Sequence, residues 1–160
     1  MNREKGFTLV ELLVVIAIIA VLAGAVLLAI NPLSMLQKAR DAKRLSDLET
    51  VSKAIALAMT DGEVTLVIAG PVTSVEGTQA VDGTGWVRFT PKTTGLARWI
   101  PSLPIDPTNV APNVYTFQST VDGFEIHAVL EHLDNVGKMQ TDGGTAVGSY
   151  EVGTLLSIIQ

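Results

Sequence analysis

The chain has 160 residues, a formal net charge of −5 and no cysteine, and 48% of its residues are apolar while 17% are charged. This length is enough for one domain with a hydrophobic core, which argues against intrinsic disorder. The acidic balance argues against a nucleic-acid partner, because binding phosphates requires a basic face. The lack of cysteine excludes disulfide bonds, thiol catalysis and zinc sites built on thiolates.

The charge and the turn-forming residues are concentrated in the second part of the chain. Residues 61–160 carry four basic and eleven acidic side chains, whereas residues 1–60 have a net charge of +2. Twelve of the fourteen glycines and six of the seven prolines also follow residue 60. The sequence therefore predicts a helical N-terminal part and a turn-rich, acidic, globular head at residues 62–160.

An apolar segment extends from Phe7 to Ile30, and Glu11 is its only ionisable side chain. As a helix, its 24 residues span about 36 Å, which is enough to cross a hydrocarbon core of about 30 Å. Arg3 and Lys5 precede it and favour a single-pass protein with its N-terminus on the cytoplasmic side. A secretory signal peptide has a similar order of residues, but its apolar part is only about 7 to 15 residues long.

Glu11 is unusual in a spanning helix, because a carboxylate near the membrane centre costs about 2 to 3 kcal/mol. One explanation is that it lies one turn inside the membrane and reaches the headgroups. The other is that a cation meets it once the helix leaves the lipid. Such a pair is favourable at only one axial offset between neighbouring helices. It therefore fixes that offset more than it adds to stability.

The run KGFTLVELL from Lys5 to Leu13 resembles the class III signal peptide shared by type IV pilins and type II secretion pseudopilins. The resemblance implies that residues 1–6 form a leader and that a prepilin peptidase cuts between Gly6 and Phe7. The same enzyme is then expected to methylate the new amino group of Phe7. The resemblance also implies that Glu11, the fifth mature residue, neutralises the Phe7 ammonium of a neighbouring subunit during filament assembly.

Residues 31–61 are predicted to form an amphipathic helix, with Leu45, Leu48 and Ile55 on the face that covers the head. Asn31-Pro32 at its start predicts a kink or a loosened turn, and a simple membrane exit explains the same dipeptide. The basic cluster at residues 38–44 is interpreted as a solvated or subunit-facing surface, with contact to anionic lipid headgroups as the alternative.

The head is predicted to contain a small antiparallel sheet. Strand-forming runs occur at 64–68, 86–89, 114–117 and 124–130, and Asp122-Gly123 predicts a hairpin between the last two. In the last run, apolar residues alternate with polar ones, which predicts one face under the helix and one face in solvent. The four prolines between residues 100 and 112 predict an extended connection. The fold class is therefore α+β, and the resemblance implies the pilin fold, a long N-terminal helix packed on the sheet.

No catalytic constellation is evident in the head, so we expect no enzyme activity and no resident cofactor. His127 and His132 lack zinc-site spacing and are interpreted as surface histidines. The major pseudopilins that the chain resembles bind calcium in a C-terminal loop, to which Asp134, Asn135 and Asp142 could supply oxygen ligands here; a solvated acidic loop is the simpler interpretation. The disulfide that clips this loop in many type IV pilins is absent, which leaves packing or an ion to hold the loop.

Together these features predict a structural subunit of a type IV pilus or pilus-like filament, made as a prepilin in the cytoplasmic membrane. Its apolar helix would form the core of an extracellular or cell-surface filament. The expected partners are other copies of the chain, a prepilin peptidase, an assembly ATPase and a platform protein. Two alternatives stay open: a major pseudopilin of a type II secretion system, and a membrane-anchored binding domain whose helix is only a tether. The tether does not explain Gly6, Phe7 and Glu11 together.

Overall fold

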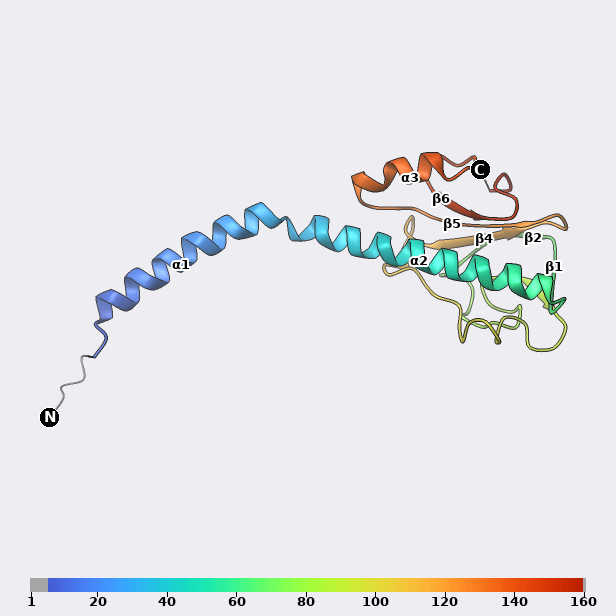
Figure 1. Ribbon diagram of the computed structural model, residues 1–160, viewed down its shortest axis with the longest axis horizontal. Helices are drawn as coiled ribbons and strands as arrows, with labels where there is room; N and C mark the ends of the chain where they lie inside the picture. The colour runs from blue at the N-terminus through green and yellow to red at the C-terminus, as the bar shows by residue number, and fades with distance from the viewer. Residues whose placement is uncertain (1–5, 160) are drawn as a thin grey trace. The chain divides into compact units, whose positions relative to one another are not determined.

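The computed structural model describes residues 6–159, with the backbone alone described at residues 28 and 29. The chain divides into two compact units, Met1–Leu36 and Gln37–Gln160. The first unit contains helix α1 (Leu9–Ile30) and the beginning of helix α2 (Pro32–Thr60). The second contains the remainder of α2 and a β-rich head, most of whose elements are labelled in Figure 1.

The first unit is dominated by apolar side chains that the described chain leaves uncovered. The stretch Leu9–Leu27 has a mean hydropathy of 2.9, and none of it is buried. It is long and apolar enough to cross a membrane. The interruption predicted at Asn31-Pro32 is present, because Asn31 is left-handed with φ 46° and ψ 77°. Helix α2 restarts at Pro32, whose fixed φ and missing N–H suit the first helical position.

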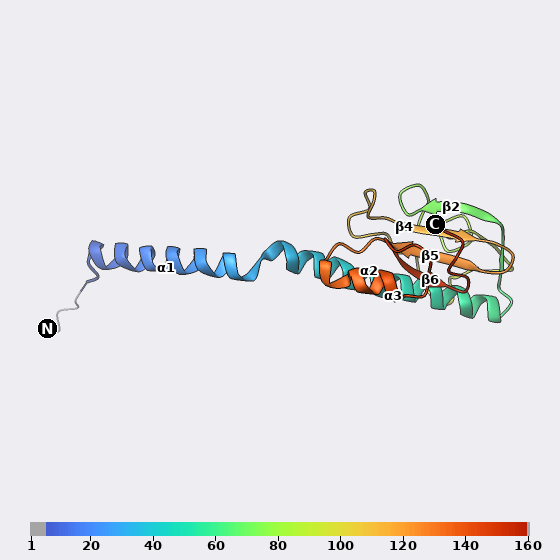
Figure 2. The same cartoon turned by 90° about the horizontal axis from the view of Figure 1, so that it is seen from above.

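The head contains two antiparallel sheets. Four strands pair in the order β2 (Ala69–Thr73), β4 (Tyr115–Ser119), β5 (Phe124–Ala128) and β6 (Tyr150–Gly153), and they lie side by side in Figure 2. Strands β1 (Val64–Leu66) and β3 (Phe89–Pro91) form a separate pair. A 3-10 turn, η1 (Leu133–Asn135), and the short helix α3 (Val136–Thr141) connect β5 to β6. The architecture is α+β and consistent with the pilin fold.

The strand predictions are confirmed in part. The hairpin at Asp122-Gly123 joins β4 to β5 in the structure. The run at 86–89 becomes a strand only from Phe89, while Trp86 lies buried in the preceding loop. Strand β2 was not predicted because it contains Pro71. The sheet tolerates this proline because β2 is an edge strand with a register irregularity between Ala69 and Val72.

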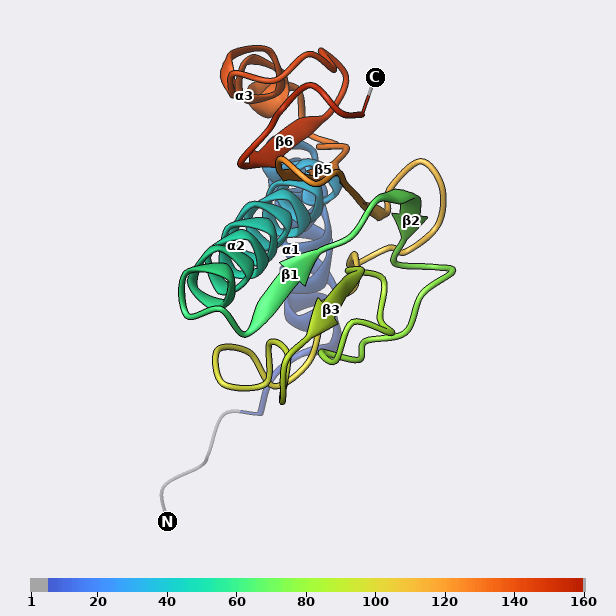
Figure 3. The ribbon, with the colours of Figure 1, turned by 90° about the vertical axis from the view of Figure 1, so that its right-hand side faces the viewer.

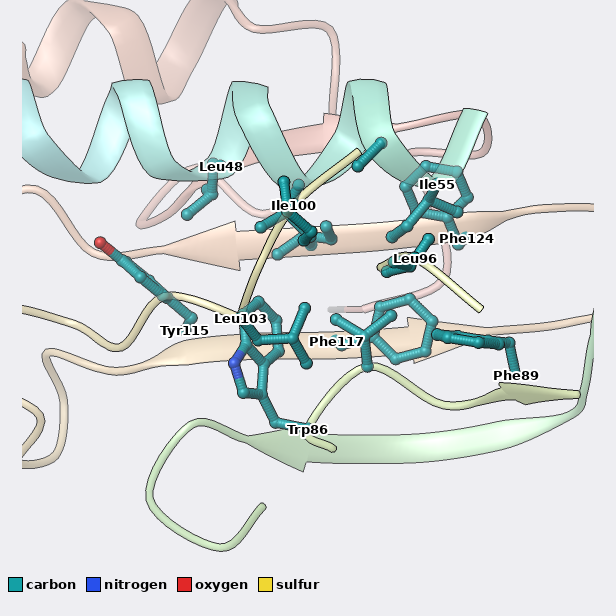
Figure 4. Packing of buried hydrophobic residues seen from close by; sticks show 14 of the residues in the cluster. Leu48, Ile55, Trp86, Phe89, Leu96, Ile100, Leu103, Tyr115, Phe117 and Phe124 are labelled. Atoms are coloured by element: carbon teal, nitrogen blue, oxygen red, sulfur yellow. The ribbon is translucent and has the colours of Figure 1, made fainter. Parts of the chain in front are cut away.

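The core of the head lies between α2 and the larger sheet. Leu48 and Ile55 point from α2 toward the sheet, and Ile55 lies near Phe124, as Figure 4 shows. Loops supply further buried side chains, among which Trp86, Leu96 and Leu103 are fully buried. The apolar helix face predicted from the sequence is thus confirmed at Leu48 and Ile55, whereas Leu45 is only half-buried.

The opposite face of β5 is covered as well, which contradicts the prediction of a solvated face. Glu125 on this face is fully buried, and His127 is half-buried. In the end-on view of Figure 3, α3 lies beside β6, away from the pair of β1 and β3. The backbone beyond β6 also contacts this face, where Glu125 accepts hydrogen bonds from two residues near the C-terminus. The interpretation of His127 and His132 as surface histidines is therefore wrong, since both are half-buried.

Candidate processing and assembly site

The predicted cleavage position lies in exposed, non-helical chain immediately before α1. Gly6 and Phe7 precede the first helical residue, Leu9, and the side chain of Phe7 is largely exposed. A Cβ built on Gly6 would meet nothing within 4 Å. The peptide bond between Gly6 and Phe7 is therefore open to a protease. Residues 1–5, the remainder of the predicted leader, lie outside the described residues.

Thr8 and Glu11 close the N-terminal end of α1 as a capping box. The carboxylate Oε2 of Glu11 accepts hydrogen bonds from the Thr8 backbone N–H at 2.8 Å and from the Thr8 hydroxyl at 2.7 Å. In return, the Glu11 backbone N–H donates to Thr8 Oγ1 at 3.2 Å. These bonds satisfy groups that the first helical turn leaves without partners. The negative charge of Glu11 is also favourable there because helix N-termini are partially positive.

The capping box orients Glu11 toward the cleavage position. Both bonds from Thr8 end on Oε2, so Oε1 can still accept a donor. Cleavage before Phe7 would place an ammonium group one residue ahead of Thr8, at the same end of the helix. The role of Thr8 was missed in the sequence, although its spacing from Glu11 is the capping-box pattern. Pairing of Glu11 with Phe7 of another copy stays a prediction.

A second group of charged residues, the ionic cluster of Asp41, Arg44, Asp106 and Glu131, is buried in the head. Arg44 is fully buried, so the interpretation of residues 38–44 as a solvated surface is wrong at this position. The Arg44 guanidinium donates to Asp106 at 2.6 and 3.0 Å and to Asp41 at 3.0 Å, and it lies 2.6 Å from Glu131. Burial alone would lower the pKa of Arg44, but these carboxylates raise it.

Asp41 joins this cluster to the chain that follows β5. Its carboxylate accepts hydrogen bonds from the backbone N–H groups of Glu131 and His132 at 2.8 and 2.9 Å. It also accepts one from the Asn135 side chain at 2.8 Å. The cluster thus ties α2 to the proline-rich loop through Asp106 and to the start of η1 through Asp41. In a chain without cysteine, these noncovalent contacts link segments that are far apart in the sequence.

The residues considered for calcium are not brought together. Asp134 pairs with Lys38 at 2.7 Å, Asn135 donates to the ionic cluster, and Asp142 accepts the backbone N–H groups of Gly144 at 3.0 Å and Glu151 at 2.8 Å. Within residues 6–159, no group of three or more histidine, cysteine or acidic side chains is placed to hold a metal ion. These three residues therefore do not form a shared calcium site, and the expectation of no resident cofactor, with calcium as the alternative, stays a prediction.

The comparisons with known proteins bear on the N-terminal segment. Residues 1–27 match the family model described as the prokaryotic N-terminal methylation motif. No curated protein and no solved structure matches the chain. The motif spans Gly6, Phe7, Glu11 and most of α1, and it implies processing by a prepilin peptidase and assembly into filaments. This match supports a precursor that resembles the type IV pilins and pseudopilins, and the apolar helix at its N-terminus fits a membrane-anchored chain.

Proposed function

We propose that this chain is a structural subunit of a type IV pilus or pilus-like filament. It is made as a single-pass prepilin in the cytoplasmic membrane, cleaved after Gly6, N-methylated at Phe7 and polymerised through α1. The observation that carries the proposal is that α1 is apolar and uncovered by the described chain, with one acidic side chain held at the end next to the cleavage position. A motif match at the same residues supports it.

The physical basis of assembly is the transfer of α1 from lipid to a bundle of identical helices. Burying Glu11 in such a bundle without a cation would cost several kcal/mol, as would burying a bare ammonium. Pairing Glu11 with the Phe7 ammonium of a neighbour removes both penalties in one axial register. An assembly ATPase and a platform protein would drive this extraction, and the heads would coat the filament outside the cell.

The first experiment determines the mature N-terminus of the purified protein by mass spectrometry. We expect a chain that begins at Phe7 and carries one methyl group on its amino nitrogen. Gly6→Val should leave the precursor uncut, because a branched side chain obstructs access to the peptide bond. Gly24→Val, which changes an exposed glycine inside α1, serves as the matched control and should be cut normally. A native chain that retains Met1 would support the membrane-anchored binding domain instead.

The second experiment separates processing from assembly. We expect Glu11→Ala to be cut and inserted in the membrane but absent from filaments isolated by shearing. Glu49→Ala removes an exposed acid of α2 that pairs with Lys53 at 2.6 Å, and it should assemble normally. Normal filament yield from Glu11→Ala would contradict the pairing of Glu11 with Phe7, while leaving the processing result intact.

A major pseudopilin of a type II secretion system is the alternative within the same family. Two features favour it: the lack of a disulfide, and the Asp-Pro loop at residues 103–107, which resembles the loop ahead of the last hairpin in pseudopilin and pilin heads. Asp106 in this stretch is buried and bound to Arg44, so the loop is a fixed part of the head. Deletion of the gene distinguishes the two roles. Loss of surface filaments supports the pilus, and loss of exoprotein export with filaments retained supports the pseudopilus.

A further inference from the structure

Two buried acids face each other across β5 and β6. In the register of these strands, Glu151 lies opposite His127, and Gly153 lies opposite Glu125. Residues opposite each other in an antiparallel pair share a face, so Glu125 and Glu151 are diagonal neighbours on the face away from α2. Glu125 is 0% exposed and Glu151 is 2% exposed. Two carboxyl groups therefore lie in the same dry part of the head.

Each acid uses one oxygen to hold the end of the chain. Glu125 Oε2 accepts the backbone N–H groups of Ile158 at 2.9 Å and Ile159 at 3.1 Å. Glu151 Oε2 accepts the backbone N–H of Ala146 at 2.9 Å. The bonds to Glu125 fasten residues 154–159, the C-terminal segment after β6, to the sheet, and the bond to Glu151 holds the loop before β6.

The second oxygen of each acid lacks a hydrogen-bond partner. Within residues 6–159, the buried side-chain atoms without a partner are Oε1 of Glu125, Oε1 of Glu151 and Nδ1 of His127. If both carboxyl groups were ionised, two negative charges would be close together away from water, which is strongly unfavourable. A proton on one of them turns an acceptor into a donor and gives both orphan oxygens a partner.

The charged groups around the pair do not relieve this repulsion. Asp142, at the end of α3, accepts the Glu151 backbone N–H at 2.8 Å and adds negative charge. Burial lowers the pKa of His127 on β5, which favours its neutral form. Burial also raises the pKa of Glu151 to about 7, and the contact with Glu125 acts in the same direction. The packing is tight, because a Cβ on Gly144 would lie 1.9 Å from Glu151 Oε2.

We propose that Glu125 and Glu151 share one proton in the folded head, and that loss of this proton loosens the C-terminal segment from the sheet. The pKa of Glu151 is higher in the folded chain than in the unfolded chain. The stabilisation is therefore complete below the unfolded value of 4.5 and is lost as the pH rises through about 7. The pair is a pH-sensitive latch that is closed in acidic media, about half released near pH 7 and open in alkaline media. It concerns the head alone and does not depend on the proposed filament role.

The direct test is a titration of the full-length chain in detergent micelles, with the glutamate carboxyl carbons labelled with carbon-13. We expect the signal of Glu151 to change in one step near pH 7, and the signals of Glu125 and Glu151 are each assigned with the glutamine variant. Glu63 is the internal control because it is also buried but accepts three backbone N–H groups and one hydroxyl. Its signal should show an ionised carboxylate from pH 5 upward.

Two outcomes of the titration would overturn the proposal. One is that both Glu125 and Glu151 are fully ionised at pH 6. The other is that added calcium chloride shifts the pH at the midpoint of the step. This would show that a cation holds the pair in place of a proton. Both outcomes are measured on the wild-type chain, and the glutamine variants serve only to assign its signals.

Hydrogen exchange tests the effect of the pair on the C-terminal segment. After correction for intrinsic rates, we expect the protection of the Ile158 and Ile159 amides to fall by about tenfold or more between pH 5.5 and pH 8, since one pKa unit corresponds to a tenfold change. Glu151→Gln keeps a neutral donor and should remove this dependence. Glu76→Gln, at an exposed acid, should retain it. Equal protection of the wild-type amides at both pH values would contradict the latch.

Discussion

Replacing Arg44 with leucine tests whether the ionic cluster holds the head together. The change removes three hydrogen bonds to the carboxylates of Asp41 and Asp106 and one to the Thr108 hydroxyl at 3.1 Å. It leaves two fully or almost fully buried carboxylates without their cation. Removing one partner of a buried ion pair costs about 3 to 5 kcal/mol, chiefly because the remaining charge is desolvated.

The two aspartates keep other hydrogen bonds after the substitution. We therefore expect the stability lost in Arg44→Leu to stay within about 3 to 5 kcal/mol. Asp41 keeps its three donors from the chain after β5, and Asp106 keeps the backbone N–H groups of Thr108 at 2.8 Å and Asn109 at 3.2 Å. For a domain of this size, 1 kcal/mol corresponds to about 3 to 5 °C in Tm. We therefore expect Tm to fall by about 10 to 20 °C.

The assay is thermal unfolding of the full-length chain in detergent micelles, followed by near-ultraviolet circular dichroism of the buried tryptophan. Lys43→Leu is the matched control, because Lys43 is an exposed neighbour that pairs with Asp47 at 2.9 Å. Its contribution should be below about 1 kcal/mol. The Tm of Arg44→Lys should lie between those of Arg44→Leu and the wild type, because lysine keeps the positive charge but lacks the planar set of guanidinium donors. If Arg44→Leu unfolds within 1 kcal/mol of the wild type, the cluster is not what fastens the proline-rich loop.

Three further outcomes are expected from the same unfolding assay. Burial raises the pKa of Glu63, but its hydrogen bonds lower it to about 2; its stabilisation is therefore present above 4.5 and lost as the pH falls to 2. Glu63→Gln should consequently flatten the fall in Tm between pH 5 and pH 2.5. Leu48→Ala in the core should cost about 2 to 5 kcal/mol, whereas Leu57→Ala on the exposed side of α2 should cost less than about 0.5 kcal/mol. Gly77→Ala should cost about 1 to 3 kcal/mol, because the new Cβ would lie 2.5 Å from the Cα of Trp86, which cannot move aside easily.

The features that depend on neighbouring residues in the sequence could be predicted. The apolar run, the break at Asn31-Pro32 and the hairpin at Asp122-Gly123 each depend on the local preferences of a few consecutive residues. The expected cleavage position and the role of Glu11 come from the resemblance of nine consecutive residues to a family signature, and they stay predictions. The capping box was also detectable, because Thr8 and Glu11 are one helical turn apart.

The buried charges could not be predicted, because their partners are distant in the sequence. Arg44 lies in a run of charged residues typical of a solvated helix face, and its partner Asp106 is 62 residues away. The alternating pattern of β5 is the same whether its polar face meets water or another part of the chain. The cover over Glu125 comes from a C-terminal segment with little periodic structure, which gives no pattern to detect.

The charged side chains of the head and of α1 differ in where their partners lie. Asp41, Arg44 and Asp106 each have several partners within the same chain, so their charges are compensated before any assembly. Within residues 6–159, Glu11 accepts hydrogen bonds from Thr8 alone, and the helix around it exposes apolar side chains. Thr8 supplies neutral donors, which cannot compensate the negative charge once lipid or other helices surround it. The described residues give Glu11 no cation, and the amino group released by cleavage at Gly6 would have the required charge; its pairing with Glu11 of another copy stays a prediction.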